Sequence, residues 1–142
     1  LIMECIIFQN VKNLGIKTTQ LRRVVFSVLR QEKKKADLSV HLIGDARMKK
    51  LNRSYRRKDR MTDVLSFATK DGKKLGNQLD LGDIFISVPQ IRRQAKDFGV
   101  LYKEEFFRLL IHGVLHLLGY DHMKNRDALI MFAKQEKYLN QI

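Results

Sequence analysis

The chain has 142 residues and carries 28 lysines and arginines against 15 aspartates and glutamates, a formal net charge of +13. Its length suits a single domain over residues 1–142, and a 44% hydrophobic content excludes a disordered chain. The charge predicts a polyanionic partner, which could be nucleic acid, an acidic membrane surface or an acidic protein. The lone cysteine, Cys5, excludes an internal disulfide and favours a reducing, cytoplasmic location. The longest apolar stretch, near 109–118, is too short to span a membrane, so we expect no membrane partner.

The first half of the chain predicts two strands, two helices and a basic loop. The strands are expected at 3–8 and 38–43, the helices at 19–33 and 45–54, and the loop at 55–61. In the longer helix, Thr18 or Thr19 is a candidate N-cap. Its apolar side chains recur with helical spacing and predict one buried face: Leu21, Val24, Val25, Val28 and Leu29.

The second half predicts two strands, at 63–68 and 81–87, and then three helices. A turn or loop at 70–74 joins the strands, and the last two helices are expected at 102–118 and 125–139. The first helix is expected to begin with a capping box of Ser87 and Gln90, with Pro89 in its first turn. It should end at Gly99 and present Ile91, Ala95 and Phe98 on one face. Because strands cluster early and helices late, the pattern predicts an α+β fold.

Three of the four histidines lie within the segment HGVLHLLGYDH, residues 112–122. His112 and His116 are spaced i, i+4, so both project from one face of a helix. Gly119 can end that helix in a left-handed conformation, which allows His122 to turn back toward the other two. Three imidazoles with one open position form the usual catalytic zinc site, and three core histidines would each need a buried partner instead. The leucines and other apolar residues between them are interpreted as packing.

The spacing H-x-x-x-H-x-x-G-x-x-H is that of metzincin metalloproteases and predicts a zincin-like metal-site helix. Metzincins carry a glutamate base after the first histidine, and here that position is Gly113. Metal-assisted hydrolysis is still possible, but an ordinary zincin peptidase is not favoured.

A second informative segment is NRSYRRKDRMTDVLSF, residues 52–67. Its basic side chains are suited to phosphate oxygens, and Tyr55 could stack on a base. A solvated charged loop is the alternative interpretation. Beside a metal site in a chain of charge +13, the cluster favours a phosphodiester substrate; it comprises Arg53, Arg56, Arg57, Lys58 and Arg60.

These motifs, together with LGDIFIS at 81–87, resemble the YbeY family of bacterial metal-dependent endoribonucleases. The resemblance covers most of the chain, from the helix before Tyr55 to the helix with Met131 and Glu136. It implies a compact α+β fold with a mixed sheet. It also implies cleavage of single-stranded RNA in 16S rRNA 3′-end maturation and ribosome quality control, with the small ribosomal subunit and assembly factors as partners. One departure is Met61, where family members often carry proline.

The resemblance also implies the site residues. Three histidines that match His112, His116 and His122 would hold one divalent ion. We expect Zn²⁺, although three imidazoles also suit Ni or Cu, so the sequence does not identify the native metal. An arginine important for activity matches Arg56, after Asn52 and Tyr55.

We expect the metal either to activate a water or to polarise a phosphoryl oxygen, while Arg56 neutralises charge in the transition state. The flanking phosphates are assigned to Arg57, Lys58 and Arg60, with weaker candidates on a helix at Arg92, Arg93 and Lys96.

Other roles stay open at this point. Asp121 could orient a ligand histidine or serve only as a turn residue. Asp63 and Asp83 could act as bases or have structural roles, so no general base is identified. Two rival functions are a metal-dependent hydrolase of another substrate, including a divergent peptidase, and a non-catalytic RNA-binding assembly factor with a structural metal.

Overall fold

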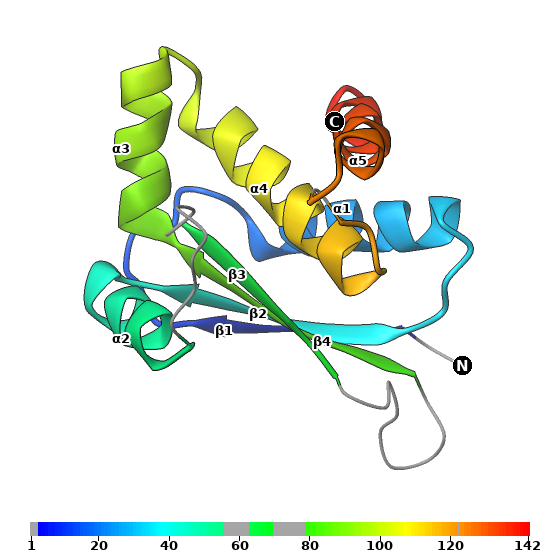
Figure 1. Cartoon of the computed structure of the whole chain (residues 1–142). Coiled ribbons are helices and arrows are strands. Elements are labelled where there is room, and N and C mark those ends of the chain that lie inside the picture. Colours follow the sequence, from blue (N-terminus) through cyan, green and yellow to red (C-terminus); the bar gives the residue numbers. More distant parts are fainter. Residues whose placement is uncertain (1–2, 56–62, 70–78, 122) are drawn as a thin grey trace.

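The structure is a computed structural model that describes residues 3–55, 63–69, 79–121 and 123–142. One mixed sheet lies at its centre, with the strand order β1-β2-β4-β3 (Figure 1). The strands are β1 (Cys5–Gln9), β2 (Asp37–Ile43), β3 (Val64–Ala68) and β4 (Asp80–Ser87). Both β1 and β4 run parallel to β2, whereas β3 pairs antiparallel with β4. The α+β fold with a small mixed sheet is therefore confirmed.

Five helices surround the sheet in the described part of the chain. They are α1 (Thr18–Gln31), α2 (Asp45–Tyr55), α3 (Val88–Phe98), α4 (Tyr102–Leu117) and α5 (Asn125–Leu139). Every predicted helix and strand is present, and its ends differ from the prediction by at most two residues. Of the predicted loops, residues 56–61 and 70–74 lie outside the described residues. No helix in the described ranges is long and apolar enough to cross a membrane.

The two faces of the sheet are covered differently (Figure 1). On one face α4 contacts β3, β4, α1, α3 and α5, and it belongs to the main hydrophobic core. The apolar face predicted for α1 is confirmed, because all five of its predicted residues are buried in this core. On the other face α2 packs through Met48 against Ile43 and Leu65 in a smaller cluster.

Two predicted helix caps are wrong. The first helix begins at Thr18 after Lys17, so both threonines lie inside its first turn and neither caps it. Ser87 is the N-cap residue of α3, but its side chain makes no cap hydrogen bond. The Ser87 hydroxyl instead donates to Asp45 Oδ1 at 3.2 Å, which joins the start of α3 to α2.

The buried face predicted for α3 is correct in part. Ile91 and Ala95 are buried, whereas Phe98 is 66% exposed. Gly99 ends the helix with a φ of +68°, and the amide of Val100 bonds to the Ala95 carbonyl at 3.0 Å. Phe98 therefore lies in the last turn, on the predicted face but outside the core.

Candidate metal-binding and active site

The core helix α4 presents His112 and His116 on one face. Leu109, Leu110, Ile111, Val114 and Leu115 are buried around them, which fixes the helix in the core. Both histidines are partly exposed, and their ring centroids lie 4.8 Å apart at an interplanar angle of 74°. The prediction that both histidines project from one helix face is thus confirmed, because the two rings lie side by side on α4.

Gly113 lies where α4 packs closely on the sheet. A Cβ atom at this position would stand 2.9 Å from Ile84 Cγ2 and 3.2 Å from Ser66 Oγ. The Ser66 hydroxyl also donates to the Gly113 carbonyl at 3.3 Å. Position 113 therefore faces the sheet, and glycine is needed there because the helix packs directly on β3 and β4.

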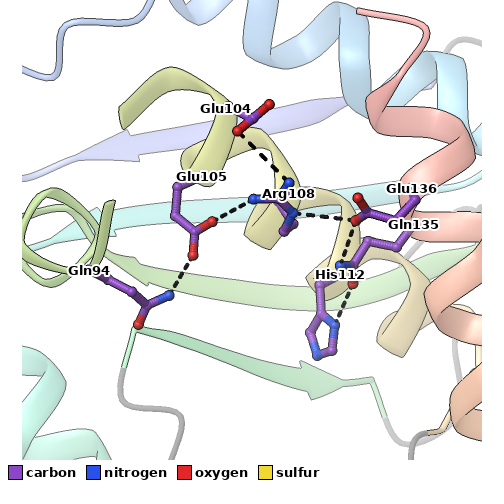
Figure 2. A network of polar contacts seen from close by, with 7 residues as sticks. All are labelled: Gln94, Glu104, Glu105, Arg108, His112, Gln135 and Glu136. Atoms are coloured by element: carbon purple, nitrogen blue, oxygen red, sulfur yellow. Dashed lines mark hydrogen bonds and ion pairs between the residues drawn. The ribbon is translucent and has the colours of Figure 1, made fainter. Parts of the chain in front are cut away.

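Gln135, on α5, contacts His112 and was not predicted from the sequence. Its Oε1 lies 2.9 Å from His112 Nδ1 (Figure 2). An amide oxygen only accepts, so Nδ1 must donate the hydrogen, and the lone pair of the neutral ring is then on Nε2. A partner of this kind fixes the tautomer and orientation of histidines that bind metals through the other nitrogen.

Behind Gln135, a chain of polar contacts continues along α4 to α3 (Figure 2). Gln135 Nε2 donates to Glu136 Oε2 at 3.4 Å, which also accepts from Arg108 Nε at 3.3 Å. Arg108 in turn donates to Glu105 Oε1 at 2.8 Å, and Glu105 Oε2 accepts from Gln94 at 2.6 Å. One arginine thus faces two bonded glutamates, with Glu104 at 3.9 Å as a third. The chain of contacts thus links the support of His112 to α3 through Arg108 and its carboxylate partners.

A cavity of about 720 Å³ opens beside His112 between α3, α4 and α5. Its walls are mostly apolar and include Leu109 and Met131, while Leu129 and Phe132 are 71% and 60% exposed. Its volume is in the range of ligand-binding sites in proteins. The first histidine of the motif therefore borders a space large enough for part of a substrate.

The turn after α4 follows the predicted course as far as the structure describes it. Gly119 has a φ of +100°, and the Tyr120 amide bonds to the Leu115 carbonyl at 3.0 Å, a Schellman motif. Asp121 Oδ1 accepts from the Met123 amide at 3.0 Å, which supports its role as a turn residue. His122, the predicted third ligand, lies outside the described residues.

Glu32, at the C-cap of α1, binds this turn and α5. Its carboxylate accepts from the Tyr120 hydroxyl at 2.6 Å, from Lys134 Nζ at 2.9 Å and from the Tyr138 hydroxyl. Burial alone would raise the pKa of Glu32, but these three donors outweigh it and lower the pKa. Burial and the Glu32 charge also raise the pKa of Tyr138 to about 12. An anionic anchor thus holds the turn two residues before His122.

The donors present fit a divalent ion bound through imidazole. His112 and His116 share one helix face, and the amide of Gln135 selects the His112 tautomer that a metal requires. No three His, Cys, Asp or Glu side chains converge among the described residues, and His122 is not one of those. The ligand set of His112, His116 and His122 therefore stays a prediction.

The structure describes only some of the predicted phosphate-binding residues. The arginines and lysine at Arg56, Arg57, Lys58 and Arg60 lie outside the described residues, as does Met61. Arg92 is engaged within the fold, since it donates to the Asn13 and Leu14 carbonyls and stacks 4.0 Å above the Tyr102 ring. Arg93 makes two bonds to Asp45, at 2.8 and 2.9 Å, and these lower the pKa of that carboxyl. Lys96 is exposed on α3.

The two candidate bases lie in different surroundings. Asp63 is 1% exposed at the start of β3, where burial raises the pKa of its carboxyl and Glu105 acts in the same direction. Asp83 lies on the sheet face away from α4, with Oδ1 2.8 Å from His41 Nε2. Asp83 is therefore separated from His112 by the sheet and has a partner of its own.

Fold and site together define a small α+β protein whose core helix presents two histidines on one face, the first of them beside a cavity. A family model described as Endoribonuclease YbeY matches residues 7–142. The chain belongs to the YbeY family, which confirms the resemblance noted in its motifs.

Individual relatives agree with this assignment. Endoribonuclease YbeY of Desulfitobacterium hafniense is 45% identical over 120 residues, which are 80% of this chain and 76% of the relative. Endoribonuclease YbeY of Persephonella marina is 43% identical over 107 residues, 75% of this chain and 70% of the relative. The solution structure of TM1509 from Thermotoga maritima has a TM-score of 0.68 at 28% identity, and the match covers 96% of this chain and 87% of that one.

Proposed function

We propose that this chain is a metal-dependent endoribonuclease that cleaves single-stranded RNA in the cytoplasm, in the maturation of the 16S rRNA 3′ end. The observation that carries the proposal is the pair of histidines on one face of α4, with His112 oriented by Gln135 beside a cavity. The chain belongs to the YbeY family, whose relatives are named endoribonucleases, and this supports RNA as the substrate of that site. The net charge of +13 is consistent with a polyanionic substrate.

The metal is assigned to His112, His116 and His122, and the proposed ion is Zn²⁺. Such an ion supplies a Lewis acid at the scissile phosphate. Gln135 would keep His112 in the ligating tautomer through the bond to Nδ1. Arg56 would neutralise the charge that develops on the phosphorus oxygens, while Arg57, Lys58 and Arg60 hold flanking phosphates.

The biological setting follows from the family resemblance and belongs to the proposal. The substrate would be met on or near the small ribosomal subunit, together with assembly factors. A role in ribosome quality control would use the same cleavage on defective particles.

Metal binding is tested by elemental analysis of purified variants. His116→Ala should strip the ion, because a ligand on the rigid helix is lost. His41→Ala is the matched control, since His41 is bonded to Asp83 on the opposite sheet face. The ligand assignment fails if His116→Ala retains one ion per chain, or if the control loses it.

Cleavage is tested with a labelled single-stranded RNA, with casein as the competing substrate. Arg56→Ala should lower the cleavage rate roughly a hundredfold or more with its fold and metal content intact, because a charge-stabilising group is removed. Arg30→Ala, exposed in the last turn of α1 and outside the basic cluster, is the matched control and should cleave at nearly the wild-type rate. Casein cleavage without RNA cleavage would establish the peptidase alternative. Activity that survives chelation would point to a contaminating nuclease.

The ends of the product RNA identify the nucleophile. A 2′,3′-cyclic phosphate results when the neighbouring 2′-hydroxyl of the RNA attacks. A 3′-hydroxyl or an acyclic phosphate results when water attacks, and either outcome refines the role assigned to Arg56.

A further inference from the structure

Three aromatic rings form a column across the sheet on the face away from α4. Phe8 of β1, His41 of β2 and Phe85 of β4 are direct cross-strand partners. The Phe8 and His41 centroids lie 4.7 Å apart at 11°, and those of His41 and Phe85 lie 4.1 Å apart at 14°. We call these three residues the aromatic ladder. Its rings can stack face to face because neighbouring strands lie about 4.8 Å apart, which is close to the spacing of stacked aromatic rings.

The two ends of the aromatic ladder differ. At the Phe85 end, Phe67 packs edge-on with its centroid 5.7 Å away, and the Arg47 guanidinium lies 5.7 Å from the Phe85 centroid. At the other end Phe8 lies on the edge strand of the sheet and is 46% exposed. One face of the Phe8 ring is covered by His41, so the exposed part includes its outer face. The ladder is therefore a column that is closed at one end and accessible at the other.

The Phe85 end of the ladder is flanked by basic side chains. Arg47 belongs to α2, which packs on the same sheet face and also exposes Lys49, Lys50 and Arg53. The acidic side chain of that helix, Asp45, is paired with Arg93. Asp83, beside the ladder, is paired with His41. An RNA strand that runs from Phe8 toward α2 would meet these cations at the Phe85 end, where the carboxylates of Asp45 and Asp83 already have partners.

We infer that the aromatic ladder is a second RNA-binding surface, where an unpaired base stacks on the outer face of Phe8 and α2, at the Phe85 end, contacts phosphates further along the same strand. Stacking on aromatic rings next to a basic flank is how proteins hold single-stranded nucleic acid without reading its sequence. This inference rests on the proposed function for the choice of RNA. The ladder and the histidines lie on opposite faces of the sheet, so the strand held here is remote from the bond that is cut.

The test separates stacking from general apolar contact. Binding of a labelled unstructured RNA of about 16 nucleotides is measured with all metal chelated, so that no cleavage occurs. Phe8→Leu keeps the apolar volume but removes the ring, and it should weaken binding roughly tenfold. Phe8→Tyr keeps the ring and should bind like the wild type. The matched control is Ile6→Ala, since Ile6 is 39% exposed on the same strand and face.

The inference fails if Phe8→Leu binds like the wild type, or if Ile6→Ala weakens binding as much as Phe8→Leu does. The second outcome would mark an apolar surface for a protein partner. Thermal unfolding of each variant checks that the fold is kept, and Phe8→Tyr provides a readout at the same position without loss of the ring.

Cleavage with metal present distinguishes this inference from the proposed function. Phe8→Leu should raise KM for the long RNA and leave kcat unchanged, with little effect on an RNA of about four nucleotides. Wild-type protein that binds RNA through Phe8 but cleaves none would overturn the proposed function alone. Wild-type protein that cleaves RNA with no difference from Phe8→Leu would overturn the ladder alone.

Discussion

The helix with His112 and His116 and the turn that leads to His122 are held in opposite ways. Helix α4 is held by close packing and by a neutral amide, through Gly113 against the sheet and Gln135 against His112. The turn is held by a carboxylate, since Glu32 accepts from Tyr120 and from two side chains of α5. Packing and amide bonds do not depend on the charge of an acid, whereas the Glu32 anchor does. The two parts of the proposed metal site should therefore respond differently to substitution and to pH.

The largest effect is expected from breaking the charged anchor. Glu32→Ala removes the acceptor of three hydrogen bonds, one of them from the buried Tyr138, and should lower the free energy of unfolding by about 2–3 kcal/mol. Urea unfolding followed by circular dichroism measures the change. Glu32→Gln keeps one acceptor oxygen and should lose less. If Glu32→Ala were as stable as the wild type, the Glu32 carboxylate would not stabilise the turn, and the proposed difference between α4 and the turn would be wrong.

The next effect tests the neutral support of His112. Gln135→Leu leaves His112 Nδ1 without this acceptor and should weaken metal affinity about 10- to 100-fold, measured by competition with a chromophoric chelator. Gln135→Glu retains an acceptor and should bind metal more tightly than Gln135→Leu. Equal affinities for Gln135→Leu and the wild type would show that packing alone orients His112.

A smaller effect is expected where α4 touches the sheet. Gly113→Ala places a methyl group 2.9 Å from Ile84 Cγ2, and this overpacking should destabilise the fold by about 1–2 kcal/mol after the gain in helix propensity. In an Ile84→Ala background the same substitution should be neutral or stabilising, because the obstructing atoms are gone. A double-mutant cycle in urea measures this coupling. Independent, additive effects would contradict the close contact.

The smallest effect is the pH dependence of the anchor. The pKa of Glu32 in the folded protein lies below its ordinary value of 4.5, because its three donors favour the charged form. Its contribution to stability is therefore fully present above about pH 4.5 and is lost as the pH falls through the folded pKa. The stability difference between wild type and Glu32→Gln should shrink on acidification from pH 6 to pH 3, measured by thermal unfolding. A difference that stays constant over this interval would exclude the charge as the source.

Local patterns were sufficient to predict the helices and strands. The spacing of Leu21, Val24 and Val28 predicted the buried face of α1, and the i, i+4 spacing predicted the placing of His112 and His116. The strand order β1-β2-β4-β3 was not predicted, because pairing depends on contacts between distant segments. Capping by Ser87 was wrong for a similar reason, since a tertiary partner, Asp45, competes for the hydroxyl.

The supports of the site were not visible in the sequence either. Gln135 lies 23 residues from His112, and no local motif marks an amide whose partner is on another helix. Glu32 is likewise far from Tyr120 and Tyr138 in the chain. Gly113 did carry a signal, because glycine inside an apolar helix is unfavourable without a reason. The structure gives that reason, which is the close contact of position 113 with Ile84 and Ser66.

Helix α4 has one further consequence for how the protein would acquire its ion. Its buried face touches both sheet strands beside it and three other helices, so the fold is built around the histidine-bearing element by apolar contacts. The chain should fold first and take up metal afterwards, unlike a zinc finger, in which binding and folding are one event. Which ion is bound would then depend on the metals available to the folded protein in the cell. A wrong ion could be exchanged without unfolding of the chain.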